Sequence, residues 1–168
     1  MITDLVQIRL LGEKKREENL RLRRHMKSHD HSDRILRRIA EDIEQQIDCL
    51  QCANCCRVAT AKVTERDVDR LARHFRVKPQ RILADYVVES EEEGFILKRR
   101  ESGECVFLEG NECTVYEARP ETCQRYPHLV RGPGSIAARM WEMVDRATMC
   151  PIVYNTLEAF KVQLKFKP

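Results

Sequence analysis

Four cysteines stand within the eight residues 49–56, in the order Cys49-x2-Cys52-x2-Cys55-Cys56. Two thiols at positions i and i+3 can bind one metal ion together, because a single turn of backbone directs both sulfurs toward the same point. Here that spacing occurs twice in succession, and an adjacent fourth thiol follows. Eight thiols suffice for two four-thiolate sites, or for one site with thiols left over. All eight are predicted metal ligands, the later four being Cys105, Cys113, Cys123 and Cys150.

The amino-acid composition favours a metal site over a disulfide framework. Eight cysteines in 168 residues are about 5% of the chain, below the roughly 8–10% of disulfide scaffolds. Charged residues make up 34% and apolar residues 42%, so the core is modest and a bound metal would help to stabilise it. The sequence has no apolar run of roughly 18 residues and no secretory signal. We therefore expect a cytoplasmic protein, without a membrane segment, whose thiols stay reduced.

The first 48 residues are predicted to form helix in two pieces, separated between Ser28 and Ser32. Between Lys14 and Lys27, seven basic residues face two acidic ones. This pattern is typical of a solvated helix face, and alternatively of a surface for an acidic partner. The net charge of +3 is too near balance to favour nucleic acid, so the expected partner is a protein of unknown identity. Three histidines near the break have the spacing and polar setting of a loop and not of a metal site: His25, His29 and His31.

The second helical piece has a clear apolar face. Its apolar residues recur every three or four positions, which is the helical period. They are Ile35, Leu36, Ile39, Ile43, Ile47 and Leu50. This helix is therefore predicted to lead directly to Cys49, so that the first thiols lie at its C-terminal end and on the turn beyond.

The segment after the first cysteines is predicted to begin extended, over residues 57–63, and then to form two packing helices. A capping-box pattern at Thr64 to Asp67 opens the first helix, and Pro79 suits the first position of the second. Apolar residues at helical spacing follow in both: Val68, Leu71, Ala72 and Phe75, then Ile82, Leu83, Tyr86 and Val87. The acidic run 89–93 is predicted to end this helical part.

The later part of the chain combines strands with a final helix. Residues 95–98 read as a strand, and two β-rich runs around Gly110-Asn111 predict a hairpin that brings Cys105 and Cys113 together. Cys123 is expected at the start of a turn or short helix. A closing amphipathic helix is predicted from Val153, Leu157, Phe160 and Leu164.

These elements predict an α+β fold. It is a small, cysteine-rich, metal-stabilised domain of short helices plus a β-hairpin, with a helical N-terminal extension. The expected boundaries are 1–45 for the partly basic extension, 46–152 for the metal-binding domain, and 153–168 for a C-terminal helix that packs on it.

Several separate motifs, in order along the chain, resemble one known family. The first cysteine run is followed by Cys105, Cys113, Arg119-Pro120, Cys123 and Tyr126-Pro127. This order is similar to that of the YkgJ-type cysteine-cluster (CxxCxxCC) family, a zinc- or iron-chelating domain with eight characteristic cysteines. The resemblance covers roughly residues 49–151 and implies that all eight thiols take part in metal binding.

The spacing of the first cysteines bears on which metal is bound. Zinc takes four thiolates tetrahedrally and needs only pairs of neighbouring cysteines. A cubane iron–sulfur cluster is bound by a C-x2-C-x2-C run with a further Cys before Pro, and Cys150-Pro151 offers such a residue far downstream. The triplet therefore favours an iron–sulfur cluster, of 4Fe-4S type, over the alternative of two four-cysteine zinc sites. Cys55 and Cys56 are adjacent, so their side chains are expected to diverge, and one of them could serve a second site.

Two functions remain open on the sequence alone. An iron–sulfur cluster would give a redox or accessory protein, whereas zinc would give a structural or interaction module whose partner surface is the basic helix. No catalytic residue is predicted, since nothing in the spacing of His128 and Cys123 requires them to act as base and nucleophile. We therefore do not expect an enzyme.

Replacing Cys52 by Ser is expected to abolish metal binding and to destabilise the domain, because the hydroxyl is a poor substitute for a thiolate ligand. Metal analysis and thermal unfolding of the purified variant measure both effects. Unchanged metal content together with an unchanged melting temperature would show that Cys52 is not a ligand.

Overall fold

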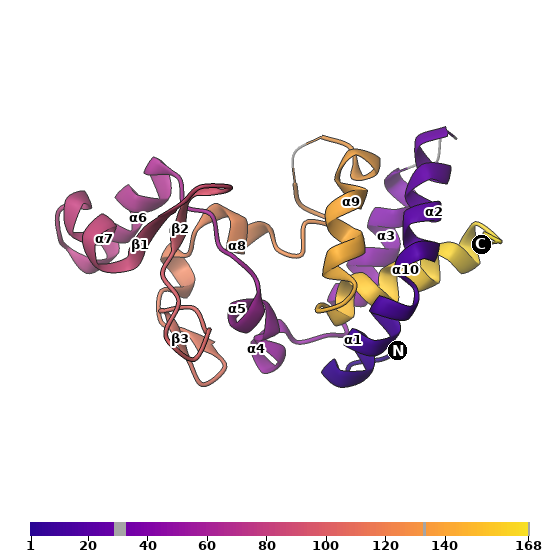
Figure 1. Cartoon of the computed structure of the whole chain (residues 1–168), viewed down its shortest axis with the longest axis horizontal. Coiled ribbons are helices and arrows are strands. Elements are labelled where there is room, and N and C mark those ends of the chain that lie inside the picture. Colours follow the sequence, from indigo (N-terminus) through magenta and orange to yellow (C-terminus); the bar gives the residue numbers. More distant parts are fainter. Residues whose placement is uncertain (29–32, 133, 168) are drawn as a thin grey trace. The chain divides into compact units, whose positions relative to one another are not determined.

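The computed structural model describes residues 1–28, 33–132 and 134–167 (Figure 1). It has the predicted α+β composition, with helices and two small antiparallel strand pairs. The chain divides into two compact units, which we call the helical unit (residues 1–48 and 127–168) and the cysteine unit (residues 49–126). These units divide the chain at other places than the predicted domains 1–45, 46–152 and 153–168, because residues 127–152 group with the N-terminal helices.

The helical unit is built from five helices within the residues described. α10 packs against α3 and α1, and α2 packs against α9 (Figure 1). Their bounds are α1 (Leu5–Lys14), α2 (Arg16–Ser28), α3 (Asp33–Glu44), α9 (Ile136–Arg146) and α10 (Pro151–Gln163). None of the described helices is both long and apolar enough to cross a lipid bilayer.

Helix α1 approaches the end of α9 so closely that only glycine fits between them. A Cβ atom added to Gly12 would lie 2.5 Å from the Ala147 carbonyl oxygen, far inside van der Waals contact. The backbone of Gly12 is therefore packed directly on the turn that follows α9.

A buried ionic network links α2 with α10. Lys161 is only 5% exposed. Its ammonium group donates to the Asn19 side-chain oxygen at 3.1 Å, pairs with Glu18 at 2.6 Å, and also pairs with Glu158. A buried charge must be paired to be tolerated, so this network fixes which face of α2 meets α10.

Several expectations for the helical unit need correction. The helix predicted to continue through Lys15 is interrupted there, and this break separates α1 from α2. The break that was predicted near Ser28 to Ser32 lies outside the described residues, and so do His29 and His31. The ring of His25 contacts that of Phe166, with centroids 5.4 Å apart. Helix α3 ends at Glu44, before the first cysteine. Its predicted apolar face is confirmed at Leu36, Ile43 and Ile47 but is wrong at the exposed Ile35 and Leu50.

The cysteine unit contains short helices and both strand pairs (Figure 1). Strands β1 and β2 pair antiparallel, with Val87 opposite Leu97, and the hairpin β3–β4 places Leu108 opposite Cys113. The bounds are α4 (Cys49–Cys52), α5 (Asn54–Val58), α6 (Glu65–Phe75), α7 (Pro79–Tyr86), β1 (Val87–Ser90), β2 (Gly94–Leu97), β3 (Leu108–Glu109), β4 (Glu112–Cys113), the 3-10 helix η1 (Tyr116–Ala118) and α8 (Glu121–Arg125).

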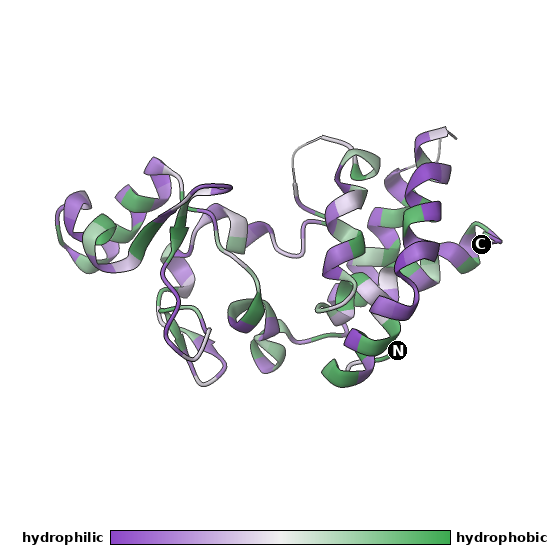
Figure 2. Ribbon diagram, in the orientation of Figure 1, coloured by the Kyte–Doolittle hydropathy of each residue, from purple (hydrophilic) through white to green (hydrophobic). Residues whose placement is uncertain are grey.

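The cysteine unit has a small apolar core of its own. Figure 2 shows hydrophobic residues along the β1–β2 pair and alternating with hydrophilic ones on α6 and α7. The rings of Phe75, Tyr86 and Phe107 lie against one another, with centroid distances of 4.8–5.9 Å. The buried members of the core are Val63, Val68, Leu71, Ala72, Ile82, Val87, Leu97, Phe107, Val115 and Ala118. The predicted apolar faces are therefore confirmed at Val68, Leu71, Ala72 and Ile82. They are wrong at Phe75, which is exposed, and at Val87, which begins β1 and is not part of α7.

Two predictions for the cysteine unit, both made from local sequence patterns, are wrong. Residues 57 and 58 end helix α5, and the extended conformation begins at Ala59. Residues 61–63 then pair with β2 through the Lys62–Ile96 bridge. The acidic run begins inside strand β1 and does not follow a helix directly. The strand at residues 87–90 forms by antiparallel pairing with β2, which follows closely in sequence, and helical periodicity does not report such pairing.

Asp67 joins the start of α6 to the start of α8. The side chain is 1% exposed. It accepts hydrogen bonds from the Thr64 backbone N (2.9 Å) and hydroxyl (2.7 Å), from the Glu121 backbone N (2.9 Å), and from Arg70. Burial works to raise the pKa of Asp67, but these hydrogen bonds outweigh it and hold the pKa below the usual value. The predicted capping box is thus confirmed, and it also anchors the helix that bears Cys123.

Replacing Asp67 by Asn is expected to lower the free energy of unfolding of the cysteine unit by about 2 kcal/mol, because a buried, charge-assisted hydrogen-bond network is broken. Urea unfolding followed by amide NMR signals from α6 and α8 measures the loss. Asp69→Asn, an exposed substitution on the same helix, is the matched control and should change little. Equal stability of the two variants would contradict this role for Asp67.

Candidate metal centre

Two short helices present the first four cysteines. Cys49 and Cys52 begin and end α4, and α5 carries Cys55 and Cys56. Between them Ala53 is buried in a left-handed conformation, with φ of 44°. Because a left-handed residue ends one helix and redirects the chain, the second pair of thiols starts a new turn and does not continue the first.

The sulfurs of Cys55 and Cys56 lie 4.0 Å apart, so the expectation that these neighbouring side chains diverge is wrong. A tetrahedron with metal–sulfur bonds of about 2.3 Å has sulfur–sulfur edges of about 3.8 Å. The observed separation is therefore close to that of two thiolates on one zinc ion.

Four thiols from separate segments of the cysteine unit interact with one another. We call Cys56, Cys105, Cys113 and Cys123 the thiol group. The backbone N–H of Cys105 donates to the Cys56 carbonyl at 2.8 Å, and the β3–β4 hairpin returns the chain to Cys113. Charge on Cys56, Cys105 and Cys113 raises the pKa of Cys123. The predicted approach of Cys105 to Cys113 is confirmed, since Cys113 pairs with Leu108, whose backbone N–H donates to the Cys105 carbonyl at 3.0 Å.

The four cysteines of the thiol group differ in their pKa values. Burial, followed by the neighbouring cysteines, raises the pKa of Cys123 from 9.0 to about 12. Burial also raises the pKa of Cys105 and of Cys113. In contrast, a hydrogen bond from Cys55 and then the charges of nearby arginines lower the pKa of Cys56 to about 7. Since the metal ligand is the thiolate, binding at this group must displace protons from its buried thiols.

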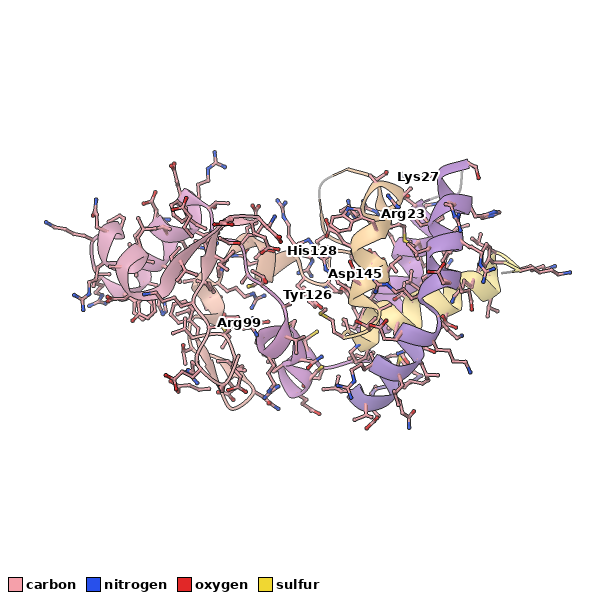
Figure 3. The ribbon with its side chains drawn as sticks, in the orientation of Figure 1. Arg23, Lys27, Arg99, Tyr126, His128 and Asp145 are labelled. Atoms are coloured by element: carbon pink, nitrogen blue, oxygen red, sulfur yellow. The ribbon has the colours of Figure 1, made fainter. Side chains whose placement is uncertain are left out.

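Three arginines supply positive charge to the thiol group. Arg57, Arg99 and Arg119 each lower the pKa of Cys56. Arg99 donates to the Ala59 carbonyl at 2.6 Å and to the Arg57 carbonyl, which holds it at the end of α5 (Figure 3). Sequence reasoning did not identify these residues, although Arg57 directly follows the first cysteine run and Arg119 belongs to the Arg-Pro motif.

The turn of the β3–β4 hairpin is bonded to α4 and α5. Arg57 donates to the Cys52 carbonyl at 3.1 Å and to the Gly110 carbonyl at 2.8 Å, and it contacts the Asn111 side-chain oxygen at 2.5 Å. The Asn111 amide in turn donates to the Gln51 carbonyl at 2.8 Å. These bonds fix the hairpin, with Cys113 on it, against the first cysteines.

The remaining predicted ligands differ from one another in exposure. Cys49 is exposed and Cys52 is half-buried. Cys150 is 6% exposed and precedes α10 in the helical unit, so its role as a ligand stays a prediction. Among the described residues, no three His, Cys, Asp or Glu side chains stand at the mutual distances of a completed metal site.

Comparisons with known proteins give one match. The model of a family described as "CxxCxxCC: Putative zinc- or iron-chelating domain" matches residues 48–151. No curated protein and no solved structure matches the chain. The match covers all eight cysteines together with the hairpin and the helices between them.

In the reduced, metal-free protein at pH 7, iodoacetamide is expected to alkylate Cys56 faster than Cys123. The thiolate is the nucleophile in this reaction, and the pKa is about 7 for Cys56 but about 12 for Cys123. Mass spectrometry of timed samples gives both rates. The rate at Cys56 should level off above pH 7 while that at Cys123 stays low. Equal rates, with the helical circular dichroism retained, would show that the thiol group is not assembled without metal.

Proposed function

The chain belongs to the CxxCxxCC family of zinc- or iron-chelating domains. From this premise we propose that its cysteine thiolates hold an iron–sulfur cluster or clusters, of 4Fe-4S type, each bound by four thiolates. Such a cluster accepts and donates single electrons, which would make the protein a redox or accessory protein. The eight predicted ligands are Cys49, Cys52, Cys55, Cys56, Cys105, Cys113, Cys123 and Cys150.

The observation that carries the proposal is the spacing of the first cysteine run. Cys56 of this run interacts with the thiol group, and the sulfur of Cys55 lies 4.0 Å from that of Cys56. The same run contains the C-x2-C-x2-C triplet of Cys49, Cys52 and Cys55. That triplet has the spacing of the bacterial cubane-binding run, whereas pairs of cysteines would be enough for zinc.

The charges around the thiol group also suit a bound metal. Four thiolates on a zinc ion or on a cubane cluster carry net negative charge, which is costly to bury without compensation. Arg57, Arg99 and Arg119 provide positive charge beside it. Arginine keeps this charge at any working pH, so these residues would favour the thiolate form that metal binding needs.

Zinc remains a second candidate because of the Cys55–Cys56 pair. The 4.0 Å separation of their sulfurs is close to the edge of a tetrahedral zinc–thiolate site. On this reading two four-cysteine zinc sites would stabilise the small core of the cysteine unit and nothing more. The protein would then be a structural or interaction module.

Protein purified without oxygen is expected to be brown and to contain iron and acid-labile sulfide, because a thiolate-bound cluster absorbs broadly in the visible range. An absorption spectrum, with iron, sulfide and zinc analysis on the same sample, tests this expectation. Bleaching by dithionite would support a redox role. A colourless protein containing zinc alone would overturn the iron–sulfur proposal and favour the zinc module.

The two groups of thiols can be tested separately. Cys52→Ser changes the triplet, whereas Cys123→Ser changes the thiol group. If the triplet binds the cluster, Cys52→Ser should lose visible absorbance and iron, while Cys123→Ser should retain more of both. Equal loss in the two variants would contradict a division of the ligands between two groups.

A further inference from the structure

The turn between α6 and α7, two helices that pack against each other (Figure 1), carries a concentration of positive charge. Residues 73–81 contain four lysines or arginines and no aspartate or glutamate. One of the four, Arg81, pairs with Asp85 through Nε at 2.5 Å. The other three form no ion pair with any residue that the structure describes; they are Arg73, Arg76 and Lys78. The net charge of the whole chain does not report this local excess.

The backbone of this turn leaves its side chains exposed. Every residue from Arg73 to Lys78 is exposed to solvent. Arg76 follows α6 in the left-handed conformation, with φ of 57°, and the N–H of Val77 returns to the Ala72 carbonyl at 3.0 Å. Glycine would adopt this conformation without strain, so the arginine keeps a charged side chain there at a conformational cost. We call residues 73–78 the basic turn.

Phe75 gives the basic turn an exposed aromatic ring. The side chain is 36% exposed. Its ring lies nearly parallel to that of Tyr86, with an interplanar angle of 13° and centroids 5.3 Å apart, and at 24° to that of Phe107. The ring of His74 meets it at 85°. Because the neighbouring rings already hold Phe75 in place, it can stack with a further planar group at little cost in its own freedom.

Exposed basic side chains around an exposed aromatic ring are the features that bind single-stranded nucleic acid. The positive charges attract successive phosphates, and the bases stack on aromatic rings. In a double helix the faces of the bases are already covered by neighbouring base pairs, so Phe75 would have no base to contact. An acidic protein would complement the same charges, but a stacked and exposed ring favours a ligand that has planar groups.

We propose that the basic turn binds single-stranded nucleic acid, with Phe75 stacking on a base and the three basic side chains contacting phosphates. This inference goes beyond the proposed function and does not depend on which metal the cysteines bind. Contact with three phosphates predicts that the logarithm of the binding constant falls with the logarithm of the salt concentration with a slope of about −2.

Fluorescence anisotropy of the full-length chain with a labelled oligothymidine, in about 50 mM salt, tests the proposal. An abasic strand of the same length is the matched ligand, because it has the phosphates without the bases. The wild-type chain is expected to bind oligothymidine about tenfold more tightly than the abasic strand, which is within the usual contribution of one stacked base. Equal affinity for the two strands, or binding to neither, would overturn the proposal.

Two substitutions separate the contribution of the ring from that of the charges. Phe75→Leu should bind both strands with equal affinity, since the stacking ring is removed. Arg76→Gly should weaken binding to both strands and reduce the salt slope by about 0.7, the contribution of one phosphate contact. Because glycine suits the left-handed position, Arg76→Gly should unfold at no lower temperature than the wild type, so that its loss of affinity does not come from misfolding.

Arg34→Gln is the control for net charge. Arg34 is an exposed residue of α3, in the helical unit, and its substitution removes one positive charge, as Arg76→Gly does. It should leave the affinity and the salt slope of the wild type unchanged. An equal loss of affinity in Arg34→Gln and Arg76→Gly would show that only the total charge matters and would refute a site at the basic turn.

A polyglutamate peptide, measured as a competitor in the same assay, tests for an acidic protein as the ligand. It should bind more weakly than oligothymidine, because it has no planar group to stack on Phe75. Binding as tight as that of oligothymidine would reject nucleic acid in favour of an acidic protein partner.

The wild-type chain itself covers the case in which Phe75→Leu does not fold. Addition of oligothymidine should shift the amide NMR signals of residues 73–78 and move the ring protons of Phe75 upfield, since they would lie beneath a base. Shifts confined to other parts of the chain would show that the strand binds elsewhere, and the proposal would fail.

Discussion

The cysteine unit depends on the gathering of half-buried thiols from segments far apart in the sequence. Four short stretches supply Cys56, Cys105, Cys113 and Cys123, and burial together with their mutual proximity makes three of the thiols hard to ionise. A metal ion supplies the charge that allows thiolates to form there. In the CxxCxxCC family to which the chain belongs, metal binding and folding are thus expected to be coupled through the same residues.

Hydrogen bonds from a few charged side chains hold the segments that carry these thiols. Asp67 receives bonds at the start of α6 and at the start of α8, which bears Cys123. Arg57 connects α4 with the hairpin turn, and Arg99 holds the end of α5. None of these residues is a predicted metal ligand. Their contribution is geometric and electrostatic, because they restrict where the sulfurs lie and place positive charge beside them.

The helical unit reaches stability by different means. Its last helix, α10, is buried on nearly all sides, and Lys161 forms a paired charge inside the packing. Glycine at position 12 allows backbone to meet backbone. This core is made of helices from both ends of the chain, and Cys150 is the one predicted ligand in it. Loss of metal is therefore expected to affect the cysteine unit first.

The sequence by itself determined the local features of this protein. Cysteine spacing identified the family, and periodicity and capping located α6, α7 and α10, because these signals depend on residues within a few positions of one another. Only the tertiary structure decided that residues 87–90 form a strand, that Cys55 and Cys56 stay close, and that Cys56 groups with three distant thiols. It also decided that Asp67 bonds to the start of α8 and that three arginines lower the pKa of Cys56. The grouping of Cys56 with three distant thiols and the bonds of Asp67 to α8 depend on contacts between residues far apart in the chain. The strand at residues 87–90 and the Cys55–Cys56 contact depend on local backbone geometry, and spacing and composition encode neither kind of outcome.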